Sequence, residues 1–179
     1  MTALWNRLFS VFSGKEAQLS IPSRLILVRH AEAKAADFNG EDESRELSAV
    51  GMAQAKDLGQ WLDENLSVSV DLALVSPASR AIQTYLGISA VCRQCPKAWT
   101  VEQALYKDSV ESYQTVTENS QSNCLIIVGH NPMIGQLAVN LLQPPVEQAS
   151  EYLNVVPGAC FVIDRNEQDG SHSLIKTSN

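Results

Sequence analysis

The chain has 179 residues, of which 45% are apolar, and a formal net charge of −7. This length and apolar content predict one globular domain with an ordinary core. The acidic balance excludes a general electrostatic attraction to nucleic acid or anionic lipid, because both reward clustered Lys and Arg. We therefore expect no nucleic-acid partner, and any positively charged site must be local.

The first twenty residues differ in pattern from the rest of the chain. Their apolar residues recur at helical spacing and predict a short amphipathic helix, which a polar linker joins to the main domain. This divides the chain into a helix and linker over 1–22 and a main domain over 23–179. The segment lacks the features of a signal peptide and the roughly 20 apolar residues of a membrane span. We expect it to dock on its own domain or on a partner, with a weak membrane-surface anchor as the alternative.

Apolar runs and helical periodicities alternate along the main domain. Strands are expected at 24–28, 72–75, 98–101, 124–128, 159–164 and 173–176. Helices are expected at 48–66, 77–91, 110–118 and from 129–132 to 142. Ser48 and Ser76 are the expected N-caps of the first two helices, with Pro77 in a first helical position. This alternation predicts an α/β fold, a three-layer α/β/α sandwich around a mainly parallel sheet.

The four cysteines form no dense framework: Cys92, Cys95, Cys124 and Cys160. Without a secretory signal, this usage predicts reduced thiols and a cytoplasmic location. The Cys92-x-x-Cys95 spacing is compatible with a redox motif or with half a zinc site. A zinc site needs four ligands, however, and no second pair or nearby His is present. The sequence therefore favours no functional role for this pair.

Three expected strands end in residues that suit one kind of chemistry. In such sheets, ligands bind beyond the carboxyl ends of the strands. The first strand is followed by Arg29 and His30, the second by Ser76 and, one helical turn later, Arg80, and the fourth by Gly129 and His130. We therefore expect four cationic or potentially cationic side chains to converge on one rim of the sheet.

Such a rim suits a phosphoryl group. Guanidinium groups bind its oxygens in pairs, and helix N-termini offer free amides and positive potential. Arg80 would otherwise be misplaced, because the helix macrodipole favours cations at the opposite end by about 0.3–1 kcal/mol. A neutral imidazole nitrogen is nucleophilic near neutral pH, so His30 is the candidate nucleophile. Ser76 is a further candidate for contact with the phosphoryl group.

Four sequence blocks resemble the histidine phosphatase, or phosphoglycerate mutase-like, superfamily. Leu27-Val-Arg-His-Ala-Glu32 is similar to the Arg-His-Gly signature of that family, with Ala31 in place of the usual glycine. The other blocks are Arg45-Glu-Leu-Ser-Ala-Val-Gly51, Val75-Ser-Pro-Ala-Ser-Arg-Ala-Ile-Gln-Thr84 and Ile127-Val-Gly-His-Asn-Pro132. The order and spacing of the blocks cover roughly 24–162. The short chain, with little room for a cap between 84 and 105, most resembles the small SixA-type phosphohistidine phosphatases.

The resemblance implies a role for each rim residue. His30 would be transiently phosphorylated, Arg29 and Arg80 would clamp the phosphoryl oxygens, and His130 would stabilise the developing charge. It implies no cap domain, no metal and no other cofactor. The expected substrate is a phosphorylated protein that carries phosphohistidine, or another activated phosphoryl donor. The first alternative is a phosphomonoesterase acting on a small metabolite such as a sugar phosphate, with Glu102 or Asp108 as the general acid.

Two further alternatives remain open from the residues. The same rim could bind phosphate or a phosphoprotein without turnover. A metal hydrolase could be built on His30, His130 and Glu32 or another carboxylate, although the paired arginines argue against a dication among them. The acidic run 41–43 is expected to be a solvated loop. Tyr106 either flanks the pocket or packs in the core.

Overall fold

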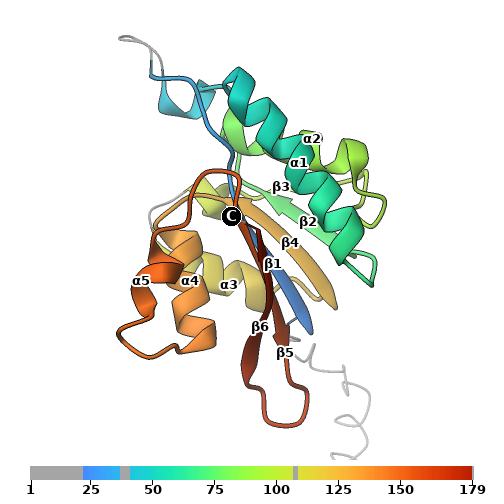
Figure 1. Ribbon diagram of the computed structural model, residues 1–179, viewed down its shortest axis with the longest axis vertical. Helices are drawn as coiled ribbons and strands as arrows, with labels where there is room; N and C mark the ends of the chain where they lie inside the picture. Colours follow the sequence, from blue (N-terminus) through green and yellow to red (C-terminus); the bar gives the residue numbers. More distant parts are fainter. Residues whose placement is uncertain (1–21, 37–40, 107–108, 179) are drawn as a thin grey trace, which may run out of the picture.

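A central six-stranded sheet lies between two layers of helices in the computed structural model, which describes residues 22–36, 41–106 and 109–178 (Figure 1). The predicted helix and most of the linker at 1–22 lie outside the described residues. Along the sheet the strands follow the order β3-β2-β4-β1-β5-β6. Their bounds are Arg24–Arg29 (β1), Leu72–Val75 (β2), Thr100–Val101 (β3), Cys124–Gly129 (β4), Cys160–Arg165 (β5) and His172–Ser178 (β6).

The four strands β3, β2, β4 and β1 are parallel, and β5 and β6 extend the sheet as an antiparallel hairpin. The register pairs Arg29 with Gly129 and Val75 with Val128. Strands β1, β2 and β4 therefore reach their carboxyl ends at one level of the sheet. The residues that follow these three strands are brought to the same rim.

Helices cover both faces of the sheet. Helices α1 (Ala49–Asn65) and α2 (Ser79–Val91) pack together on one face (Figure 1). Helices α3 (Val110–Glu118), α4 (Met133–Leu142) and α5 (Ala149–Leu153) lie on the other. Strand β1 supplies both cores, because successive side chains of a strand point to opposite faces. Ile26 and Val28 belong to the α1/α2 core, and Leu25 and Leu27 to the opposite one.

This arrangement confirms the predicted three-layer sandwich with a mainly parallel sheet. Between α2 and α3, the described residues form only β3 and a short 3-10 helix, η3 (Gln103–Tyr106). This part of the chain therefore contains no cap domain between α2 and α3. No helix within the three described ranges is long and apolar enough to cross a bilayer.

One predicted helix start is confirmed and another is wrong. Ser48 caps α1, and its side chain accepts a hydrogen bond from the Gly51 amide at 3.0 Å. Helix α2 instead begins at Ser79, and its N-cap Ala78 has no side-chain cap. The hydroxyl of Ser76 is turned toward the neighbouring strand, where it lies 2.8 Å from His130 Nε2. The same hydroxyl also accepts a long hydrogen bond from the Ala78 amide at 3.5 Å, so a weak local contact remains beside the tertiary one.

The expectation of four reduced thiols is wrong for one pair. Cys92 and Cys95 form a disulfide where α2 ends, with Cα atoms 5.4 Å apart. Both residues are buried in the core beneath α1 and α2. Cys124 and Cys160 are free and buried. The sequence spacing alone could not show that the turn after α2 brings the two sulfur atoms together. The cytoplasmic location is still only a prediction, and the disulfide argues against it because disulfides are rare in reducing compartments.

Candidate active site

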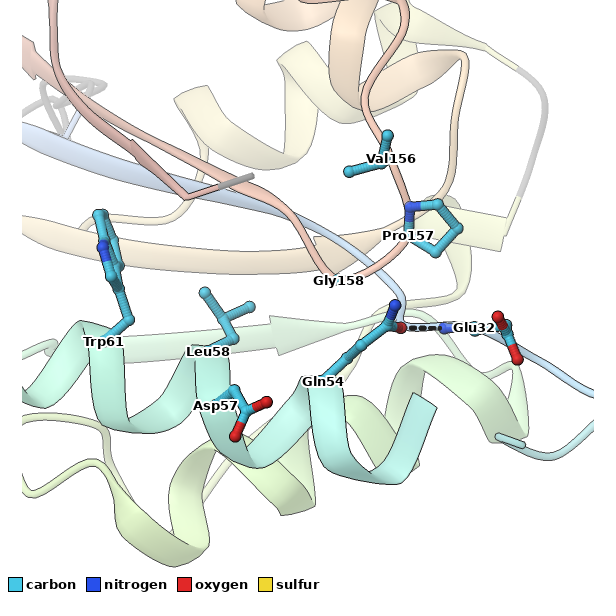
Figure 2. A pocket seen from close by; sticks show the side chains of 8 residues that line it. All are labelled: Glu32, Gln54, Asp57, Leu58, Trp61, Val156, Pro157 and Gly158. Atoms are coloured by element: carbon cyan, nitrogen blue, oxygen red, sulfur yellow. Dashed lines mark hydrogen bonds between the residues drawn. The ribbon is translucent and has the colours of Figure 1, made fainter. Parts of the chain in front are cut away.

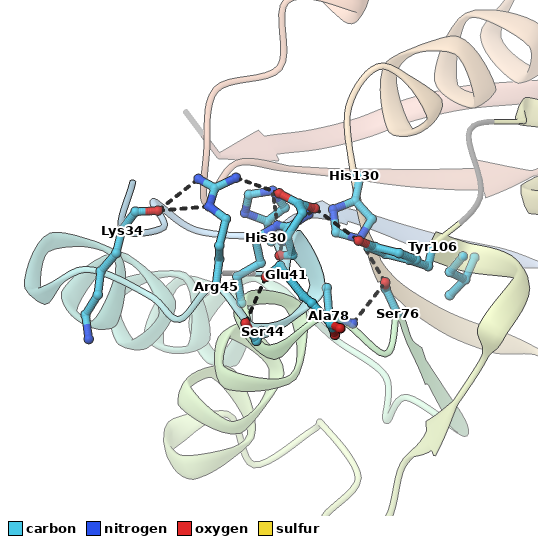
Figure 3. A network of polar contacts seen from close by, with 12 residues as sticks. His30, Lys34, Glu41, Ser44, Arg45, Ser76, Ala78, Tyr106 and His130 are labelled. Carbon is cyan, nitrogen blue, oxygen red and sulfur yellow. Dashed lines mark hydrogen bonds and ion pairs between the residues drawn. The ribbon is translucent and has the colours of Figure 1, made fainter. Parts of the chain in front are cut away.

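The ends of β1, β2 and β4 and the first turn of α2 build one polar site. Main-chain hydrogen bonds continue one residue past the strands, from the His30 amide to the Gly129 carbonyl at 2.9 Å and from the Ser76 amide to the Val128 carbonyl at 3.0 Å. His30, Ser76 and His130 therefore leave the sheet side by side. Figure 3 shows the three side chains within one network of polar contacts.

The ring of His30 is held in one tautomer. Its Nδ1 lies 2.7 Å from the carbonyl oxygen of Ala31, which can only accept, so Nδ1 carries the proton and the lone pair is on Nε2. Nε of Arg80 donates to that Nε2 at 3.2 Å. Burial is the main cause that lowers the pKa of His30 to about 4, and the nearby charges of Arg80 and Arg29 lower it further. At neutral pH the ring is therefore uncharged, with its nucleophilic nitrogen facing a guanidinium group.

His130 lies next to this ring. The two ring centroids are 5.1 Å apart, and the planes meet at 61°. Burial, followed by the charges of His30 and Arg80, lowers the pKa of His130 to about 3. Its Nε2 lies 2.8 Å from Ser76 Oγ, which fixes the orientation of the ring. The second imidazole is thus also neutral and is placed to face any group bound to the first.

Gly129 allows the chain to approach a buried tyrosine before His130. The hydroxyl of Tyr113 accepts a hydrogen bond from the His130 amide at 3.0 Å and donates to the Leu105 carbonyl at 2.6 Å. A Cβ atom at position 129 would lie 2.2 Å from this hydroxyl. Glycine is therefore required here for steric reasons, because a larger residue would displace the tyrosine that positions the main chain of His130.

Two arginines flank the imidazoles. Arg29 donates from Nη1 to the Val155 carbonyl at 2.5 Å, while its Nε is buried without a hydrogen-bond partner in the described structure. Burial lowers the pKa of Arg29. The side chain of Arg80 is 7% exposed and reaches His30 through Nε. Both guanidinium charges act on both imidazoles, so the four residues expected at the rim do come together.

Asp42 is the residue of this site that the sequence analysis missed. It lies in the 3-10 helix η2 (Asp42–Ser44), and its carboxylate forms ion pairs of 2.9 Å with both Arg80 and Arg45. Asp42 is exposed, as predicted for a solvated loop, but its carboxylate also contacts Arg80 of the site. Hydrogen bonding from Arg45, then from Arg80, lowers the pKa of Asp42 to about 2. The one local signal in the sequence was that Asp42 lies three residues before Arg45, with which it can form an ion pair. An acidic loop has no periodic pattern, so the sequence could not predict its contact with Arg80.

Neither candidate general acid, Glu102 or Asp108, is found next to the imidazoles in the described residues. Glu102 accepts a hydrogen bond from the Ala104 amide at 3.0 Å and lines a cavity with residues of β2 and α3. Neither His30 nor His130 lines that cavity. Asp108 lies outside the described residues. From this stretch of chain, Tyr106 reaches the rim, with its ring centroid 5.7 Å from that of His130.

A cavity of about 380 Å³ lies beside the rim, between α1 and the segment before β5 (Figure 2). It is lined by Glu32, Gln54, Asp57, Leu58, Trp61, Val156, Pro157 and Gly158. The amide of Gly158 donates to the His30 carbonyl at 3.2 Å, so the cavity adjoins the polar rim without including the His30 side chain.

The surroundings of Glu32 bear on the metal-hydrolase alternative. Its carboxylate accepts a hydrogen bond from the Ser48 hydroxyl at 2.6 Å. Across 22–36, 41–106 and 109–178, no three His, Cys, Asp or Glu side chains are grouped so that they could hold a metal ion. The residues named by that alternative, Glu32, His30 and His130, do not form a metal site.

A neutral nucleophilic imidazole, a second imidazole and two guanidinium groups define a site for a tetrahedral anion such as a phosphoryl group. Comparison with known proteins agrees with this chemistry. The family model of the histidine phosphatase superfamily (branch 1) matches residues 25–105. A phosphohistidine phosphatase SixA homolog from Haemophilus influenzae is 29% identical over 126 residues, which cover 65% of this chain and 76% of that protein.

Solved structures share the fold. A protein assigned as phosphohistidine phosphatase SixA from Agrobacterium tumefaciens has a TM-score of 0.78 at 22% identity, covering 89% of this chain and 99% of that one. The protein histidine phosphatase SixA complexed with tungstate has a TM-score of 0.70 at 20% identity, covering 87% and 96%. Residues 25–105 of the chain match the histidine phosphatase superfamily, and this match together with the SixA homolog supports phosphatase activity.

Proposed function

We propose that this phosphatase hydrolyses phosphohistidine on a partner protein, through a covalent phosphohistidine formed on His30. The observation that carries the proposal is the state of the His30 ring. Its proton is held on Nδ1 by the Ala31 carbonyl, and its lone pair on Nε2 faces Arg80. A nitrogen prepared in this way can attack phosphorus without first losing a proton.

In the first step, Nε2 of His30 attacks phosphorus in line with the bond from phosphorus to the substrate imidazole. The new P–N bond forms as the old one breaks, and the leaving imidazole takes a proton from solvent. Arg29 and Arg80 neutralise the equatorial oxygens, and His130 faces the charge that develops on them. Water then attacks the phosphorus atom bound to His30, the P–N bond breaks, and inorganic phosphate and the free ring are released.

The proposal explains why the site manages without a positioned acid among the described residues. The Asp42 carboxylate contacts Arg80, and its low pKa leaves it ionised at neutral pH. An imidazole leaves readily without strong acid assistance, whereas an alkoxide needs a proton. A phosphoramidate substrate therefore fits this site better than a phosphate ester. We further propose that the reaction needs no metal or other cofactor.

The decisive experiment compares kcat/KM for a phosphohistidine-bearing protein with that for a panel of phosphate esters, sugar phosphates included, in excess chelator. The proposal expects the phosphohistidine protein to be preferred. A preference for an ester would instead favour the small-metabolite alternative, and activity restored only by metal would overturn the cofactor-free mechanism.

Trapping with labelled phosphate tests the intermediate. The chain has three histidines, so His172→Ala on β6 is a matched control for His30→Ala. We expect acid-labile label on the wild type and on His172→Ala, and none on His30→Ala. Binding of the phosphoprotein with no label on any form would favour the non-enzymatic binder.

A further inference from the structure

Asp42 holds the outer side of Arg80. The two Nη atoms of Arg80 donate to a single residue: Nη1 to the Asp42 carbonyl oxygen at 2.6 Å and Nη2 to Asp42 Oδ2 at 2.9 Å. Nε of Arg80 points the other way, to His30. The guanidinium group is therefore fixed between the nucleophile on one side and Asp42 on the other.

This contact leaves Arg80 able to bind a phosphoryl group. A guanidinium group has five N–H donors, of which Asp42 takes two and His30 one. The two remaining Nη donors, together with Nε once His30 is phosphorylated, can face phosphoryl oxygens. The carboxylate itself is a poor neighbour for a dianion, because like charges repel. Its contribution must therefore pass through the arginine.

Asp42 is in turn held from two sides. Arg45 donates from Nη1 to Oδ1 at 2.9 Å and from Nε and Nη2 to the Lys34 carbonyl, at 3.0 and 2.9 Å. Tyr106 donates its hydroxyl to Oδ2 at 3.1 Å. Figure 3 shows this chain of contacts running from Lys34 through Arg45 to the imidazoles. Although the Asp42 side chain is 52% exposed, both of its oxygens are occupied, so its position is well determined.

We propose that Asp42 is a positioning residue, which holds the Arg80 guanidinium in the orientation that receives the phosphoryl group during transfer to His30. This inference rests on the proposed function and adds to it a residue from an acidic loop. A site that depends on a fixed guanidinium fork is sensitive to its rotation, because misplacement by about 1 Å can cost about 100-fold in rate.

The test uses three variants of the full chain. Asp42→Asn keeps the size, the main-chain carbonyl and one side-chain acceptor but removes the charge, whereas Asp42→Ala removes every side-chain contact. Glu43→Gln removes the same charge from the same exposed turn and is the control. We expect the single-turnover rate of phosphoenzyme formation to fall about 10-fold in Asp42→Asn and about 100-fold in Asp42→Ala. Glu43→Gln should stay within about twofold of the wild type.

Two measurements separate positioning from other roles. A positioning residue lowers kcat more than it changes KM and leaves the alkaline limb of kcat in place, whereas loss of a general acid would remove that limb. An unchanged or faster rate in Asp42→Asn would overturn the proposal and show that the carboxylate competes with the phosphoryl group. An equal loss in Glu43→Gln would also overturn it. If Asp42→Ala fails to fold by circular dichroism, Asp42→Asn alone decides.

Binding of inorganic phosphate, followed by calorimetry, keeps the two proposals distinguishable. If the wild type forms no phosphoenzyme, the proposed function fails, and phosphate affinity then decides the role of Asp42. Weaker binding by Asp42→Asn than by Glu43→Gln would support positioning, and equal or tighter binding would overturn it.

Discussion

Charged side chains are paired differently at the two ends of the sheet. At the amino end, Arg24 at the start of β1 forms a bidentate pair with Asp164 of β5, at 2.5 and 2.6 Å. Nearby, the Asp71 carboxylate accepts hydrogen bonds from the amides of Asn123 and Cys124. At this end, each of these charged side chains therefore has a partner within the protein.

At the carboxyl end, charge is incompletely matched. Arg29 has one carbonyl partner and a buried Nε that lacks one in the described structure, while Arg80 shares one carboxylate with Arg45. Two buried imidazoles stay neutral beside these cations. The paired charges at the amino end stabilise the fold, whereas the partly unpaired donors at the carboxyl end are free to bind an anion, as the proposed function requires.

The largest expected effect is the loss of the nucleophile. His30→Ala should abolish turnover, because no other described nitrogen has the same fixed lone pair beside Arg80. Steady-state assays with the phosphohistidine protein check this, and turnover at the wild-type rate would remove His30 from the mechanism. His172→Ala should retain activity, since that residue begins β6 and is not part of the rim network.

Alanine substitutions of arginines at the two ends of the sheet should have different effects. Arg29→Ala and Arg80→Ala should each lower kcat/KM by at least about 100-fold, as expected for donors that stabilise developing charge. Arg24→Ala should instead lower the free energy of unfolding by about 1.5–3 kcal/mol, the range for hydrogen bonds to charged groups, and leave kcat/KM nearly unchanged. Urea denaturation and kinetics on the same preparations measure both effects. A large activity loss in Arg24→Ala would break the division between the two ends.

The rim histidines should also make stability depend on pH. Burial lowers the pKa of His30 to about 4 and that of His130 to about 3, so between these values and the ordinary 6.5 the unfolded chain binds more protons than the folded one. The free energy of unfolding is therefore fully retained above pH 6.5. It should fall as the pH drops from 6.5 toward 4, by up to about 1.4 kcal/mol per pH unit for each histidine.

Denaturation series at pH 7 and pH 4.5 test this slope. The His130→Asn variant should show a shallower pH dependence than the wild type, because one of the two depressed histidines is gone. An identical slope would mean that His130 is protonated with its ordinary pKa in the folded state.

The smallest expected effect concerns Ser76. Ser76→Ala removes the 2.8 Å contact that orients His130, and we expect a loss of about 0.5–1.5 kcal/mol in stability and at most about 10-fold in turnover. A loss as large as that of Arg80→Ala would show that the serine contacts the phosphoryl group directly.

Local patterns were sufficient for most of the fold. The buried strands were predicted because short β-branched runs between turn residues have few alternatives, and the 72–75 and 110–118 elements match the structure at both ends. Helix α5 was not predicted, since five residues are too few to show a helical period. Ser76 does not cap α2, because the helix begins at Ser79. Its hydroxyl lies 2.8 Å from His130, which follows the neighbouring strand, and keeps only a long contact of 3.5 Å with the Ala78 amide.

The sequence by itself determined the sheet, its helical layers and which residues end three of its strands, since periodicity and chain order are local properties. Only the tertiary structure decided how those ends meet, because the register of β1, β2 and β4 is set by packing over the whole sheet. It also decided that an acidic loop residue, Asp42, holds Arg80 and that two cysteines pair in the core. Contacts between distant segments depend on how the chain returns to itself, which no single stretch of residues encodes.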